Sequence, residues 1–172
     1  MILLHWAMAV LIIAVYACIL LRVQYPRGSG VREALKTWHF QLGLAVFVLV
    51  WLRLIVRLKS PIPAIVPPPP RWQKLVAGAA ESAIYVFMIV MPLLGWLILS
   101  GENQSVPFFS LQLPALMGGD ETLAKQLEEV HETIGNIGYF LIGLHAAAAL
   151  AHHYVIRDNT LARMLPSKSS RA

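Results

Sequence analysis

The sequence is poor in charge and in cysteine. Asp, Glu, Lys and Arg make up 13% of its 172 residues, about half of the roughly 25% that is usual for a soluble domain. Its single cysteine, Cys18, lies inside an apolar stretch and excludes an intrachain disulfide framework. These two shortages argue against an ordinary soluble domain and against a small domain stabilised by disulfides.

Hydrophobic side chains are abundant instead, at 58% of the chain. They gather in four stretches of about 18–23 residues, each long enough to cross a bilayer core of roughly 30 Å as a helix. The first stretch lacks the basic start and the small-residue cleavage site of a signal peptide, so we expect a retained helix. The sequence therefore predicts an all-α fold, an integral membrane four-helix bundle in one domain of residues 1–172. We expect its helices at about 2–21, 38–58, 80–100 and 122–156.

Basic residues border the apolar stretches and form neither one patch nor a basic–aromatic motif, so the net charge of +5 does not indicate nucleic acid. They indicate orientation, because cytoplasmic connections of membrane proteins carry an excess of Lys and Arg. The side with the second connection and the last segment carries Arg53, Arg57, Lys59, Arg71, Lys74, Arg157, Arg163, Lys168 and Arg171. The other side carries Arg22, Arg27, Arg32, Lys36 and Lys125. The larger set predicts that both termini are cytoplasmic.

The three connections differ in character. Pro26 and Gly28 predict a short turn between the first two helices. The prolines of residues 67–70 favour an extended polyproline spacer, although a proline run also suits recognition by a partner. The third connection is long and acidic, and Asp120 followed by Glu121 predicts the start of the last helix.

Four of the six histidines, His5, His39, His131 and His145, lie in or at the ends of the apolar stretches. Ionisable side chains at membrane depth are costly and usually face the bundle interior, although a single interfacial histidine also suits helix capping or contact with lipid. His131 and His145 are fourteen residues apart, which returns to within about 40° of the same helix face and rises about 21 Å. One helix therefore offers two side chains at two membrane depths.

The direction of each helix then pairs the histidines by depth. With the N-terminus inside, His5 lies near the cytoplasmic face and His39 near the outer face, while the last helix runs inward from His131 to His145. We expect His39 beside His131 and His5 beside His145. Such pairs suit two haem irons with two axial histidines each, whereas zinc and copper usually gather three or four ligands at one point. Without a CxxCH motif these would be non-covalent b haems, and two axial ligands leave one-electron transfer as the chemistry.

Residues near these histidines have two interpretations. Gly138 lies seven residues from both His131 and His145, where it suits either the approach of a flat macrocycle or the close packing of two membrane helices. Trp6 and Trp38 each adjoin a candidate ligand. They either line the edge of a haem or belong to an interfacial aromatic belt.

Four segments resemble the bacterial cytochrome b561 family: His5-Trp6, Trp38-His39, residues 130–154 (VHETIGNIGYFLIGLHAAAALAHHY) and residues 157–166 (RDNTLARMLP). The resemblance covers nearly the whole chain. It implies four transmembrane helices in the bacterial inner membrane and two b haems. It also implies that the axial ligands are His5, His39, His131 and His145.

The sequence is also similar to the branch of this family that oxidises superoxide and reduces ubiquinone, a superoxide:quinone oxidoreductase. This similarity implies that His152 contacts quinone and delivers a proton, with its neighbour His153 as the rival and a histidine pair solvated by headgroups as the alternative. Basic residues of the outer loops would attract superoxide or contact membrane lipid. A second hypothesis is a cytochrome b subunit that carries electrons between a hydrogenase or dehydrogenase partner and quinone. A third is a helix bundle without haem.

Overall fold

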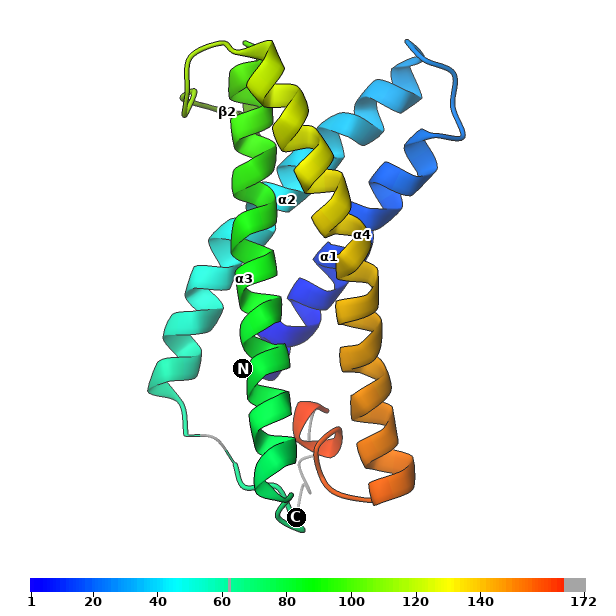
Figure 1. Cartoon of the computed structure of the whole chain (residues 1–172), viewed down its shortest axis with the longest axis vertical. Coiled ribbons are helices and arrows are strands. Elements are labelled where there is room, and N and C mark those ends of the chain that lie inside the picture. Colours follow the sequence, from blue (N-terminus) through cyan, green and yellow to red (C-terminus); the bar gives the residue numbers. More distant parts are fainter. Residues whose placement is uncertain (62, 166–172) are drawn as a thin grey trace, which may run out of the picture.

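The structure, a computed structural model, describes residues 1–61 and 63–165 (Figure 1). Its long helices are α1 (Ile2–Arg22), α2 (Gly30–Lys59), α3 (Arg71–Gly101) and α4 (Glu121–Ala151). These four spans are long and apolar enough to cross a membrane, which confirms the predicted all-α membrane bundle. The short elements are strands β1 (Val106–Phe108) and β2 (Leu111–Leu113), the π-helix η1 (His152–Ile156) and the 3₁₀-helix η2 (Ala162–Met164). Lys168 and Arg171, used above to infer orientation, lie outside the described residues.

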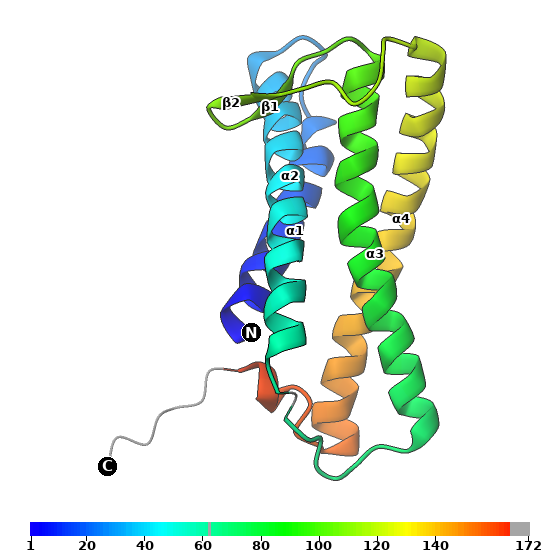
Figure 2. The same ribbon diagram turned by 90° about the vertical axis from the view of Figure 1, so that its left-hand side faces the viewer.

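The four long helices form two antiparallel hairpins (Figures 1 and 2). α1 packs on α2 and α3 packs on α4, while α2 and α3 join the hairpins. The backbones of α1 and α4 make little direct contact. Residues 60–61 and 63–70 of the second connection and residues 152–165 lie at one end of the bundle, called the terminus end below. The connections of residues 23–29 and 102–120 lie at the other, called the loop end.

Two helices begin earlier than the apolar pattern predicted. α2 begins at Gly30 and not near residue 38, because the Ser29 side chain accepts a hydrogen bond from the Arg32 amide (3.4 Å) and caps the polar first turns. α3 begins at Arg71 and not near residue 80, directly after Pro70. Hydropathy detects the part of a helix that lies in lipid, so it does not report polar turns that continue beyond the membrane.

The last helix begins and ends close to the predicted bounds, but its last turn is not α-helical. Asp120 caps its start by accepting a hydrogen bond from the Leu123 amide (3.0 Å). The α-helix stops at Ala151, and residues 152–156 continue it as a π turn to the predicted end. Arg157 then reverses the chain with a left-handed φ of 62°. Such π turns are rare and often occur at functional sites.

The core of the bundle consists of two apolar clusters. The first lies near the middle and is formed by Met8, Val46, Val50 and Met88. The second lies toward the loop end and joins Leu44, Leu99 and Val106. Val106 belongs to β1, which pairs antiparallel with β2. This small ribbon in the third connection was not predicted from the sequence, and it covers the loop end of α2 and α3 (Figure 2).

The outward faces of the helices are apolar as well. Leu3, Phe140 and Leu144 are 83%, 80% and 69% exposed. Extensive exposed apolar surface is uncommon on soluble monomers and is expected where lipid is the solvent. The chain is therefore a multi-pass membrane protein, as the sequence predicted.

Candidate functional site

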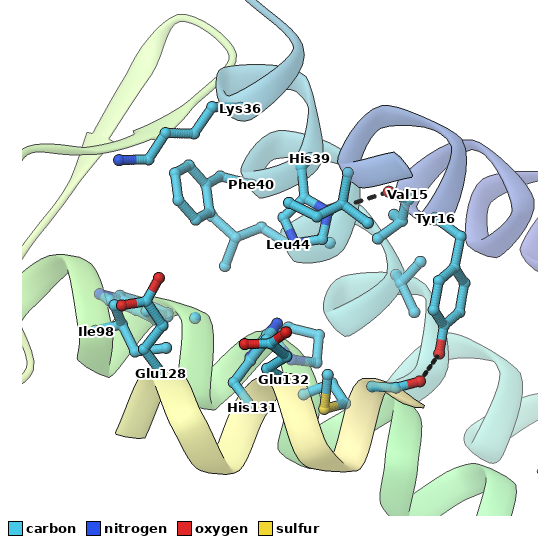
Figure 3. A pocket seen from close by; sticks show the side chains of 18 of the residues that line it. Val15, Tyr16, Lys36, His39, Phe40, Leu44, Ile98, Glu128, His131 and Glu132 are labelled. Atoms are coloured by element: carbon cyan, nitrogen blue, oxygen red, sulfur yellow. Dashed lines mark hydrogen bonds between the residues drawn. The ribbon is translucent and has the colours of Figure 1, made fainter. Parts of the chain in front are cut away.

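His39 of α2 and His131 of α4 lie opposite one another in a cavity of about 430 Å³ toward the loop end (Figure 3). Their imidazole centroids are 6.2 Å apart and the ring planes differ by 71°. The volume lies within the range of about 300–1,000 Å³ that is common for ligand sites. Gly43, Gly95 and Gly135 also line the cavity, and a Cβ at Gly43 would meet nothing within 4 Å. The cavity therefore has free space beside both imidazoles.

Hydrogen bonding selects which nitrogen His39 presents to this cavity. Nδ1 of His39 lies 3.1 Å from the Val15 carbonyl oxygen, and because a carbonyl only accepts, Nδ1 carries the proton. Nε2 then retains its lone pair, which is the arrangement that axial histidines adopt. Nδ1 of His131 is buried and has no hydrogen-bond partner among the described residues.

A second pair of imidazoles lies toward the terminus end. The centroids of His5 on α1 and His145 on α4 are also 6.2 Å apart, with ring planes differing by 58°. Two metal–nitrogen bonds of about 2 Å, plus the distance from each nitrogen to its ring centre, add up to roughly 6 Å. Both pairs thus have the spacing of two imidazoles that share one metal ion. Within residues 1–61 and 63–165, no three His, Cys, Asp or Glu side chains gather to hold a metal ion, so the arrangement differs from a zinc-type cluster.

Between the two pairs, α1 touches α4 through Tyr16. The Tyr16 hydroxyl donates a hydrogen bond to the Gly135 carbonyl (2.7 Å), and its ring centroid lies 4.4 Å from that of Tyr139. A Cβ at Gly138 would collide with the Tyr16 hydroxyl and would lie 2.5 Å from the Phe87 ring. Gly138 therefore serves close helix packing, which decides between the two interpretations of this glycine.

His152 is bound to Asp158, a residue that sequence reasoning missed. Nδ1 of His152 lies 2.5 Å from Oδ2 of Asp158, whose side chain is only 1% exposed. The Thr160 amide donates to the other carboxylate oxygen (2.8 Å). Burial raises the pKa of Asp158, but the hydrogen bonds from His152 and Thr160 outweigh this effect and hold the pKa below its usual value. Helical periodicity does not place Asp158 beside His152, because the π turn and the reversal at Arg157 bring them together. The only available signal was the RDNT segment that carries the family resemblance.

The same C-terminal turn is held to the rest of the bundle. The Asn159 side-chain oxygen accepts a hydrogen bond from the Val66 amide (2.9 Å) in the proline-rich connection. Trp6 donates its indole N–H to the Met164 carbonyl (2.7 Å), so it anchors this turn to α1. Trp38 is 49% exposed, which suits the interfacial aromatic belt.

The fold and the paired histidines define a class of protein: a multi-pass membrane helix bundle with an imidazole pair toward each end of α4. The sequence model of the family described as "Prokaryotic cytochrome b561" matches residues 1–167. The chain belongs to this family. Its members are membrane proteins that bind b-type haem and transfer electrons, so the chain has an oxidoreductase role of this kind.

Curated relatives agree with this assignment. "Cytochrome b561 homolog 1" of Escherichia coli (strain K12) is 36% identical over 165 residues, which cover 96% of this chain and 94% of the relative. "Probable superoxide oxidase CybB" of Yersinia pestis is 38% identical over 164 residues, 95% of this chain and 92% of the relative. "Cytochrome b561 homolog 2" of Escherichia coli (strain K12) is 25% identical over 167 residues, 96% and 89%.

Proposed function

We propose that this protein holds two non-covalent b haems, one between His39 and His131 and one between His5 and His145, and carries electrons from superoxide to ubiquinone. The observation that carries the haem assignment is the equal separation of 6.2 Å between the imidazole centroids of both pairs. Each pair joins α4 to α1 or α2, helices with which α4 makes little backbone contact, and this leaves space for a flat group. Bound haem with two axial histidines supplies one-electron transfer.

The residues between the two pairs fix the spacing of the ligands. His131 and His145 lie on one helix, about 21 Å apart along its axis. Midway between them, Tyr16 and Phe87 pack against Gly138 and lock α1 and α3 onto α4. The apolar cluster that includes Met8 and Met88 packs against Phe87. These contacts hold the two sites at a constant distance.

Superoxide as donor and ubiquinone as acceptor are proposed from the family branch and from the printed name of the Yersinia relative. Two superoxide anions would each lose one electron and leave as O₂, and ubiquinone would gain these two electrons and two protons to become ubiquinol. We place both termini in the cytoplasm and the protein in the bacterial inner membrane. The basic residues at the terminus end support this orientation, and superoxide would then react at the loop end.

The loop-end cavity does not by itself attract anions. Its wall carries both signs of charge: Arg22, Lys36, Glu102, Glu128 and Glu132. Arg32, included among the basic residues expected to steer superoxide, donates hydrogen bonds to the carbonyls of Arg22 (3.2 Å) and Tyr25 (2.9 Å). It therefore stabilises the turn between α1 and α2. The proposal of superoxide as the electron donor therefore rests on the relatives and not on an excess of basic residues at the loop-end cavity.

For the quinone end we propose His152, with Asp158 as its positioning residue. The hydrogen bond to Asp158 occupies Nδ1 of His152 and leaves Nε2 for a quinone carbonyl. The imidazole would donate its Nε2 proton to that carbonyl during reduction, while the Asp158 carboxylate holds the ring in place through Nδ1. His153 makes an edge contact with the Tyr154 ring at 4.7 Å between centroids, so His152 is the better supported of the two.

Haem counting on four variants tests the pairing. His39→Ala and His131→Ala should lose the same haem, and His5→Ala and His145→Ala should lose the other. The measurement is haem per polypeptide by pyridine haemochrome, together with redox-difference spectra that distinguish the two components. If His39→Ala and His145→Ala remove the same component, the pairing is wrong.

A superoxide-driven assay tests the donor and the acceptor. Purified protein should reduce ubiquinone when superoxide is supplied enzymatically, and superoxide dismutase should abolish the reaction. His152→Ala should retain both haems and slow quinone reduction. If superoxide gives no stimulation while a soluble redox subunit co-purifies and reduces the haems, the alternative of a cytochrome b subunit replaces the proposal.

A further inference from the structure

Side chains form three layers between the middle of the bundle and its terminus end. Met8 of α1, Val50 of α2 and Met88 of α3 share one buried cluster, and they define the innermost layer. Three residues toward the terminus end, a rise of about 4.5 Å, lead from Met8 to His5 and from Val50 to Arg53. Because the helices alternate in direction, His5 and Arg53 lie at nearly the same depth.

Tyr85 of α3 belongs to the layer of His5 and Arg53. It precedes Met88 by three residues, and its hydroxyl accepts a hydrogen bond from Nε of Arg53 (3.2 Å). The Arg53 guanidinium also lies 5.9 Å from the centre of the Tyr85 ring. A cation therefore stands at the depth of the imidazole pair at the terminus end.

Arg53 and Arg57 differ in their partners. Arg57 lies one turn further out on α2 and forms an ion pair with Glu81 of α3 at 2.7 Å. Arg53 has no carboxylate within 4.0 Å among the described residues, and a tyrosine hydroxyl is its only side-chain acceptor there. Arginine at membrane depth is costly unless an anion or water compensates its charge, and it usually marks a functional site.

We propose that the Arg53 guanidinium binds a carboxylate of the haem held between His5 and His145 and raises the reduction potential of that haem. This inference rests on the proposed function, because it requires a haem at that histidine pair. Haem b carries two propionate carboxylates, and the planar fork of arginine donors matches a carboxylate in bidentate geometry. Tyr85 holds Nε of the guanidinium, which leaves the two terminal nitrogens free for the carboxylate.

The expected electrostatic effect has a definite sign. Reduction removes one positive charge from the haem, so a nearby cation favours the reduced form, and removal of that cation lowers the potential. For a unit charge about 10 Å away in a medium of effective dielectric constant about 20, the equilibrium constant for reduction changes by about tenfold or more, which corresponds to about 59 mV per tenfold for one electron.

Potentiometric titration of the purified wild type and of Arg53→Gln and Arg53→Lys tests the inference, with haem content measured on the same samples. The matched control is the double variant Arg57→Gln/Glu81→Gln, which removes a neutral ion pair one turn away. Arg53→Gln should reduce the equilibrium constant for reduction of one haem by about tenfold, which lowers the potential of that haem. The potential of the other haem should stay unchanged. Arg53→Lys should restore part of the loss, and the control should retain the wild-type potential.

Each outcome has a defined meaning. Loss of only one haem in Arg53→Gln with its retention in Arg53→Lys also supports the inference. Unchanged potentials in Arg53→Gln, with both haems retained, would overturn the inference. So would an Arg53→Gln variant that differs from the wild type only in its stability in anionic lipid, because Arg53 would then bind a lipid phosphate. A wild-type protein with fewer than two haems would instead refute the proposed function, and the two failures are therefore distinguishable.

Discussion

Replacing Gly138 by alanine should destabilise the bundle where α1 meets α4. A Cβ at this position would lie 2.5 Å from the Phe87 ring and would also collide with the Tyr16 hydroxyl, and real Cβ contacts essentially never fall under 3.0 Å. Tyr16 cannot move away freely, because its hydroxyl is hydrogen-bonded to the Gly135 carbonyl at 2.7 Å. The added methyl group therefore forces either a shift of α1 or the loss of that hydrogen bond.

The magnitude follows from three terms. Overpacking of a filled core costs about 1–3 kcal/mol, and loss of a buried hydrogen bond costs about 1 kcal/mol. Alanine in place of glycine within a helix returns about 1 kcal/mol. The net loss is about 1–3 kcal/mol, and at about 2–4 °C per kcal/mol for a chain of this size the thermal midpoint should fall by roughly 2–12 °C.

Thermal unfolding of the purified protein in detergent, followed by circular dichroism, measures this loss. The matched control is Gly143→Ala in the same helix, where a Cβ would meet nothing within 4 Å, so the midpoint should stay or rise slightly. Tyr16→Phe combined with Gly138→Ala should recover part of the loss, because the colliding hydroxyl is absent. Equal midpoints for Gly138→Ala and Gly143→Ala would refute the packing role of Gly138.

Two further predictions concern the ends of the bundle. The lowered pKa of Asp158 means that its carboxylate stabilises the C-terminal turn above the ordinary pKa of an aspartate and that this stabilisation is lost as the pH falls through the lowered value. The wild type should therefore lose thermal stability relative to Asp158→Asn only below about pH 4. The measurement is the difference in thermal midpoint between pH 7 and pH 3.5 for each protein. An equal decrease in the midpoint of both proteins at pH 3.5 would contradict this prediction. Gly43→Leu should fill free space in the loop-end cavity and remove one haem per polypeptide. The control Gly78→Leu, on an exposed part of α3, should retain both haems. Haem is counted by pyridine haemochrome, and two haems in Gly43→Leu would show that no haem approaches Gly43.

The four spans were predictable because lipid imposes a simple length rule on apolar stretches. The depth of each histidine was predictable too, since fourteen residues between His131 and His145 convert directly into a rise along one helix. The structure brings His5 beside His145 and His39 beside His131, as expected. Haem ligation by these pairs stays a prediction until haem is counted.

The starts of α2 and α3 and the last turn after α4 were less predictable, because they depend on local interactions that hydropathy does not report. The Ser29 cap extends α2 into polar sequence, and the π turn after Ala151 redirects the chain toward Asp158. The ribbon of β1 and β2 consists of strands of only three residues each, too short for any periodic pattern to show.

By itself, the sequence determined that this chain crosses the membrane four times and carries histidines at two depths, because both properties follow from hydrophobicity and residue spacing along single helices. Only the tertiary structure decided how those helices meet. It set the 6.2 Å separation of the imidazoles and placed Gly138 against Tyr16 and Phe87. Among the described residues it also left Arg53 without the carboxylate partner that Arg57 has. These features depend on contacts between residues far apart in the chain, and a pattern read along one helix does not contain them.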